Sequence, residues 1–250
     1  MNGDLDTYLL TGLIFCAAML YASVGHAGAS GYLAAMALFG VAPTVMKPAA
    51  LALNILVATI ATTKFYRAHA FSWPIFWPLA VTSVPCAFLG GLITLPSAYY
   101  KPLVGVVLVY SAWRTWRAAA EMNPGPCTPP SRAVLIEIGA GLGLLSGLTG
   151  VGGGIFLSPL LLLNRWAETK TVAGTSAAFI LVNSIAGLAG VASAATTTVL
   201  PPPLPLWAFA AVVGGYIGAE LGSRRFGNPT IRRLLALVLL IAGVKMILTA

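Results

Sequence analysis

Two glycine-rich breaks in otherwise apolar sequence are the segments best suited to chemistry. They cover residues 25–31 and 147–154. Each is followed by a short apolar segment, 28–40 or 154–164, that would rise only about 15–20 Å as a helix. Such breaks leave backbone N–H and C=O groups without partners, and in apolar surroundings these groups are tolerated where they line a cavity. The N-terminal end of the next helix carries partial positive charge, which favours an anion. The breaks therefore predict an anion site made largely of backbone amides.

Polar side chains inside the apolar runs complete this expected site. Asn54 and Asn183 either hold a substrate oxygen or fasten the unwound backbone, because an amide in lipid needs a hydrogen-bonding partner. Thr175 and Ser176 could donate to an oxyanion, although hydroxyls in membrane helices more often bond the carbonyl one turn back. His26 titrates near neutrality, and it could bind the anion, shuttle a proton or satisfy loose backbone carbonyls.

The expected substrate-binding residues are these side chains and the glycines of both breaks. They are Gly25, His26, Gly28, Asn54, Gly150, Gly152, Gly153, Gly154, Thr175, Ser176 and Asn183. The alternative is that the glycines only allow helices to pack closely. We expect no catalytic residue, metal or cofactor, because the sequence has two histidines, widely separated acids and no cysteine or histidine at ligand spacing.

The elements that must position these residues are membrane helices. Of the 250 residues, 58% are hydrophobic and 8% are charged, whereas soluble proteins carry roughly 25% charged residues. A mean hydropathy of +0.90 and apolar runs of about twenty residues indicate helices rather than a transmembrane barrel. The net charge of +8 comes from basic residues beside the apolar runs, which are topology signals rather than a nucleic-acid surface.

The breaks recur at about half the chain length, which indicates an internal repeat. Gly25 and Gly28 match Gly150 and Gly153 at an offset of 125 residues. We therefore predict an all-α polytopic membrane protein made of two inverted repeats, each a re-entrant helical hairpin followed by three transmembrane helices. The predicted parts are a first repeat (1–119), a proline-rich cytoplasmic linker (120–131) and a second repeat (132–250).

Charged and aromatic residues set the expected orientation in the cell membrane. The basic clusters should lie in the cytoplasm, which places both termini outside. Lys47 and Lys170 are expected to be exposed at span ends, where they snorkel or attract anions, and Glu220 is expected to pair with Arg224 on one helix face. Aromatic residues near span ends are expected to form interface belts; they are Trp73, Trp77, Tyr99, Tyr100, Trp113, Trp116 and Trp207.

The second break and the sequence after it resemble a known family. The segments concerned are residues 147–154, Pro159, the run Ala-Gly-Thr-Ser-Ala-Ala-Phe at 173–179 and the pair 183–184. Together they are similar to the second-half signature of the sulfite exporter TauE/SafE family. Residues 25–31 form a weaker first-half copy. There, histidine and alanine replace part of the glycine-rich pattern, so the first-half site matches the family less well.

The resemblance implies a secondary transporter that exports sulfite, a sulfonate or a related organosulfur anion bound near the membrane midplane. A negative cell interior favours anion exit by about 2.3 kcal/mol per charge per 100 mV, so export needs no coupling ion. The alternatives are an uptake permease for another small anion coupled to protons or cations, a membrane enzyme, and a scaffold subunit. The expected partners are the anion and the lipid bilayer. A homodimer is an open alternative, and we expect no nucleic-acid partner.

Overall fold

The computed structural model describes residues 4–118, 128, 130–194 and 200–224, and positions 237, 240, 241, 243, 244, 247 and 248. Across these residues the chain forms helices and no strand, which confirms the predicted all-α class. The helices are α1 (Asp4–Ala22), α2 (Ala29–Leu38), α3 (Pro43–Arg67), α4 (Trp73–Leu92), α5 (Ser97–Ala118), α6 (Arg132–Thr149), α7 (Gly154–Leu163), α8 (Thr169–Ala194) and α9 (Leu204–Arg224). Most of the predicted linker 120–131 lies outside the described residues.

Six of the described helices are long and apolar enough to cross a membrane. They are α1, α3, α4, α6, α8 and α9. By contrast, α2 and α7 have 10 residues each and rise only about 15 Å, as expected for the returning arms of the two hairpins. The 22-residue α5 is not among the six, and most of the expected last span, 231–249, lies outside the described residues.

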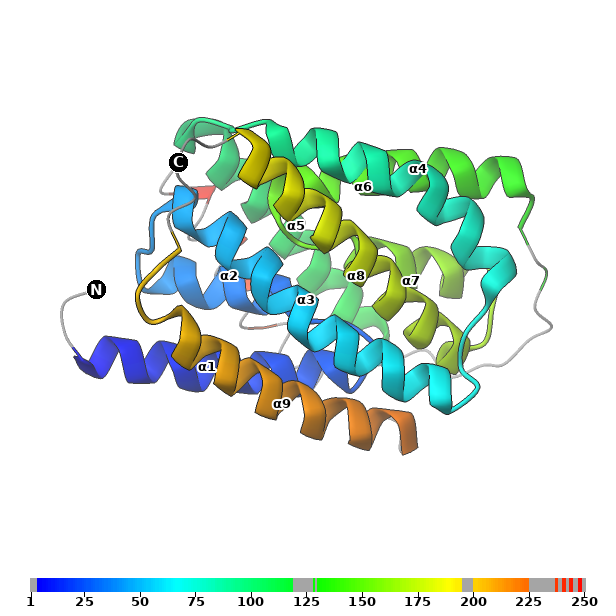
Figure 1. The fold of residues 1–250 in the computed structure, drawn as a ribbon, viewed down its shortest axis with the longest axis horizontal. Coiled ribbons are helices and arrows are strands. Elements are labelled where there is room, and N and C mark those ends of the chain that lie inside the picture. Colours follow the sequence, from blue (N-terminus) through cyan, green and yellow to red (C-terminus); the bar gives the residue numbers. More distant parts are fainter. Residues whose placement is uncertain are drawn as a thin grey trace.

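The two halves of the chain pack against each other through α3 and α8. These helices are antiparallel, because Asn54 in the first half of α3 bonds to Ser184 in the second half of α8, while Gly174 near the start of α8 lies beside Phe65 near the end of α3. In Figure 1, α1, α3 and α9 run from left to right, and α8 runs from right to left. The long helices α3 and α8, one from each half of the chain, thus point in opposite directions.

Two stripes of glycine let further helix pairs approach to backbone contact. The first stripe lies on α6 and faces α4: Gly139, Gly143 and Gly147 meet Leu79, Ser83 and Ala87. The second lies on α9 and faces α1: Gly214 and Gly218 meet Phe15 and Met19, and Gly222 meets Ser23, the residue after α1. A Cβ atom on Gly143 would lie 2.3 Å from the carbonyl oxygen of Ser83. Each stripe repeats every four residues, the spacing that small residues need to lie on one face of a helix.

An ion pair joins α3 to α9. The Lys64 ammonium donates to the Glu220 carboxylate and lies 4.3 Å above the centre of the Tyr216 ring. Glu220 therefore pairs across a helix interface, whereas the sequence predicted a partner on its own helix. The side chain of that expected partner, Arg224, lies outside the described residues.

The aromatic belt is only partly as predicted. Trp73, Trp77 and Trp113 are exposed on the surface. Tyr100 and Trp207 are instead buried, so the belt prediction is wrong for both. Tyr100 turns inward because its hydroxyl donates to the carbonyl oxygen of Thr149 at the end of α6, at 3.0 Å.

Candidate functional site

Both predicted breaks are built by glycines whose backbone takes the left-handed conformation. The φ angles are 78° at Gly25, 103° at Gly28, 80° at Gly150, 82° at Gly152 and 76° at Gly153. Other residues adopt such angles at a cost, so glycine is required here. The breaks interrupt the chain between α1 and α2 and between α6 and α7, as the sequence predicted. The first N–H groups of α2 and α7 have no carbonyl partner within their own helices, which leaves them available at the breaks.

Each break packs against a long helix of the other half. A Cβ atom on Gly25 would lie 2.3 Å from the carbonyl oxygen of Ala173 in α8, and one on Gly150 would lie 3.2 Å from that of Lys47 in α3. Ala173 and Lys47 both belong to the first two turns of their helices. The two breaks therefore occupy matching positions in the two halves.

Asn54 joins the second break to the crossing of α3 and α8. Its Nδ2 donates to the carbonyl oxygen of Val151 at 3.4 Å and to the Ser184 hydroxyl at 3.3 Å, and it is fully buried. Gly152 lies so close that a Cβ atom there would be 2.7 Å from Asn54 Nδ2. These bonds are the ones expected if Asn54 fastens the unwound backbone.

His26 joins the first break to the second. Its Nε2 lies 3.1 Å from the carbonyl oxygen of Gly154 and 2.9 Å from the Ser158 hydroxyl, which in turn donates to the Ser176 hydroxyl at 2.8 Å. A carbonyl oxygen can only accept, so a hydrogen bond to Gly154 requires Nε2 to carry a hydrogen. His26, α7 and α8 thus form one connected polar chain in the middle of an apolar core.

Two predicted site residues make other contacts. Thr175 accepts a hydrogen bond from the backbone N–H of Ser72 at 3.2 Å, beside the start of α4. Asn183 donates to the carbonyl oxygen of Phe179 at 2.8 Å, one turn back in its own helix. The Oδ1 atoms of Asn54 and Asn183 are buried with no hydrogen-bond partner among the described residues. Two acceptors next to the α3–α8 crossing are therefore open to a donor.

Lys47 is buried, and the prediction that it is exposed at a span end is wrong. Its ammonium donates to the carbonyl oxygens of Gly90, Gly91 and Ile93, at 3.1–3.2 Å, where α4 ends. Lys47 turns inward because these carbonyls belong to the last turn and the C-cap of α4 and have no partner within that helix. Lys170, at the related place in the second half, is exposed as predicted.

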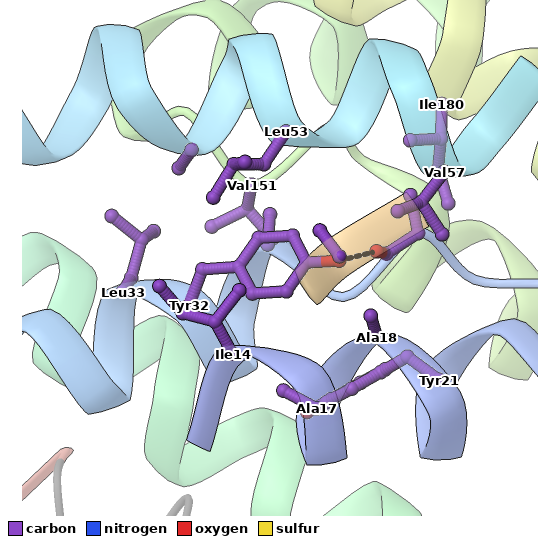
Figure 2. Close-up of a cluster of buried hydrophobic side chains, with 14 of the residues drawn as sticks. Ile14, Ala17, Ala18, Tyr21, Tyr32, Leu33, Leu53, Val57, Val151 and Ile180 are labelled. Atoms are coloured by element: carbon purple, nitrogen blue, oxygen red, sulfur yellow. Dashed lines mark hydrogen bonds between the residues drawn. The ribbon is translucent and has the colours of Figure 1, made fainter. Parts of the chain in front are cut away.

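Tyr32 is a site residue that the sequence did not single out. Figure 2 shows its ring between α1 and α3, beside Val151 of the second break, with its hydroxyl bonded to the carbonyl oxygen of Ala27. A Cβ atom on Gly28 would lie 2.8 Å from this ring. Ser158 was missed as well, although a lone hydroxyl in the apolar α7 is a signal that could have indicated it.

Comparison with known proteins gives the family of this chain. The family described as Sulfite exporter TauE/SafE matches residues 10–246. The chain is also similar to the probable membrane transporter protein y4hK of Sinorhizobium fredii (strain NBRC 101917 / NGR234), with 41% identity over 248 residues, which are 98% of this chain and 99% of that protein. No solved structure matches the chain. With its six apolar spans, the chain is a multi-pass cell-membrane transporter and belongs to the sulfite exporter TauE/SafE family.

Proposed function

We propose that this transporter exports sulfite, a sulfonate or a related organosulfur anion through a site between the two breaks. The observation that carries the proposal is the contact of His26 in the first break with Gly154 and Ser158 in the second. This contact brings the first break to the start of α7. The family description supports the class of anion, and this contact supports the position of the site.

The proposed site binds the anion through hydrogen-bond donors rather than through a paired cation. The N–H groups at the starts of α2 and α7 carry partial positive charge and suit an oxyanion. The hydroxyls of Ser158 and Ser176 and the Nε2–H of His26 add side-chain donors. Lys47 lies beside Gly150, but its ammonium donates to the carbonyl oxygens at the end of α4, so we place no ion pair between Lys47 and the anion.

We also propose that the two halves are inverted repeats that surround this site. The antiparallel crossing of α3 and α8 supports this arrangement. Two parallel helix pairs support it as well: α4 packs against α6, and α1 packs against α9. In each pair, one helix comes from the first half and the other from the second half. In such a protein, movement of one half against the other exposes a central site to each side of the membrane in turn.

Transport by the purified protein tests the proposed function. Proteoliposomes loaded with radiolabelled sulfite or sulfoacetate should release the anion they carry faster than protein-free vesicles. A potassium diffusion potential that makes the lumen negative should speed the release, because the charge moves down the field. If none of these anions leaves faster, the proposed substrate class is wrong, and chemical change of an anion would indicate an enzyme instead.

Gly152→Ala tests the position of the site. The added methyl group meets Asn54, and alanine is strained at a φ of 82°, so we expect efflux to fall at least tenfold. Gly40→Ala is the matched control, because Gly40 also has a positive φ, 67°, but no atom lies within 4 Å of its added Cβ. Equal loss in both variants would show that backbone strain, and not the site, is responsible.

A further inference from the structure

A groove on the surface between α4 and α6 combines charge, aromatic rings and apolar walls. It encloses about 570 Å³, and its lining includes Trp73, Trp77 and Val81 from α4 and Arg132 and Ile136 from α6. It lies on the outside of the bundle, away from the two breaks, and the proposed transport site does not use it. Its residues are therefore available for another ligand.

The polarity of the groove changes with depth in the membrane. Trp73 and Arg132 are the first residues of their helices, and these helices run parallel, so both side chains start at the same end of the groove. Val81 is eight residues further along α4, which is about 12 Å deeper. Ile136 lies one turn inside α6. The groove thus has a charged, aromatic mouth and an apolar floor, the order of polarity found from the headgroup to the acyl chain of a lipid.

The walls of the groove are held in place. The Trp73 ring packs edge-on against Phe71, with ring centres 4.9 Å apart, while the Trp73 side chain stays 55% exposed. The Thr82 hydroxyl donates to the carbonyl oxygen of Ile136 at 2.7 Å, which fixes α4 against α6 beside the groove. A groove with fixed walls requires little ordering when a ligand binds.

The charge of Arg132 is not neutralised by a nearby acid. Arg132 is exposed, and among the residues that the structure places it forms no ion pair with a carboxylate. Arg67 and Arg165 belong to the same end of the bundle, because α3 ends and α8 begins there. A concentration of arginine at one end of the spans indicates the cytoplasmic side, where anionic lipids carry the opposite charge.

We propose that this groove binds an anionic phospholipid of the cytoplasmic leaflet. The lipid phosphate accepts hydrogen bonds from the Arg132 guanidinium, and the indole rings of Trp73 and Trp77 flank the headgroup. One acyl chain lies along Val81 and Ile136. A bound lipid of this kind would join α4 to α6, one helix from each half of the chain.

Native mass spectrometry of the detergent-solubilised protein tests the proposal. Phosphatidylglycerol is titrated against phosphatidylcholine with the same acyl chains, and the full-length chain should retain phosphatidylglycerol preferentially. Arg132→Gln should weaken phosphatidylglycerol binding about fivefold, the effect of about one basic residue at a membrane surface. It should weaken phosphatidylcholine binding less, because the choline cation offsets the charge of the phosphate. Arg67→Gln is the matched control, since it removes the same charge from an exposed position at the same end.

A second variant fills the groove without removing charge. Ile136→Trp should exclude the acyl chain and reduce binding of both lipids while Arg132 remains, and the melting temperature of each variant shows whether it is folded. Equal losses in Arg132→Gln and Arg67→Gln would mean general charge attraction and would overturn the proposal. It would also be overturned if glycerol phosphate without acyl chains competed fully, or if Ile136→Trp left lipid binding intact and instead abolished a dimer.

Discussion

Lys47 shows how a full positive charge is kept inside an apolar bundle. Its ammonium lies at the C-terminal end of α4, where three carbonyl oxygens accept its hydrogen bonds. The partial negative charge of a helix end favours a cation there. The Lys47 side chain also lies next to Gly150, where a Cβ atom would be 3.3 Å from its Cγ. The second break thus has a buried cation beside it.

Replacing this lysine should destabilise the protein. Lys47→Met keeps the apolar stem but leaves buried carbonyl oxygens unpaired, which costs about 1–3 kcal/mol. Thermal unfolding in detergent should show the loss as a lower melting temperature. Lys170→Met is the control, because Lys170 is exposed and surface changes are usually within about 0.5 kcal/mol. A melting temperature of Lys47→Met equal to that of the control would contradict the capping role.

The stripes of glycine on α6 and α9 connect the two halves of the chain. Each stripe belongs to the second half and faces a helix of the first, so close approach of α4 to α6 and of α1 to α9 holds the halves together. These glycines differ from those of the breaks, because they lie within helices and are spaced by four. Close helix packing, the alternative to a binding site for the glycines, is observed at these stripes.

A large residue in a stripe should push the helices apart. In Gly143→Leu, the side chain would overlap the backbone of Ser83, whose carbonyl oxygen lies 2.3 Å from an added Cβ atom. Overpacking of this kind costs about 1–3 kcal/mol or more, so we expect a lower melting temperature and poorer recovery from the membrane. Gly141→Leu, two residues away with no atom within 4 Å of the added Cβ, should have little effect. Similar losses in both variants would argue against close α4–α6 packing.

The proposed inverted arrangement of the two halves predicts which loops face each side of the membrane. A cysteine at Thr44, in the first turn of α3, should react with impermeant reagents from outside. One at Glu168, just before α8, should react only after the membrane is opened. Both positions are exposed. Labelling is done in whole cells, with Cys16, Cys86 and Cys127 replaced by alanine. Reaction of both positions from one side would reject the inverted arrangement.

Composition and local backbone chemistry were enough to determine the class of this protein. The apolar runs required membrane helices, because so few charged residues cannot cover a soluble surface. The closely spaced glycines located both breaks, because the conformations that end one helix and start the next depend on only a few residues. The short helices after the breaks were predicted for the same reason.

The partners of the polar side chains were decided only by the tertiary structure. Helices such as α3 and α8 are apolar on every face, so their sequences do not show which face meets a neighbour. The rotation and crossing of these helices decide three contacts: the turn of Thr175 toward α4, the bond from Asn54 to Ser184 and the burial of Lys47. Those rotations are set by packing across the two halves, where close approach at glycine decides which side chains meet.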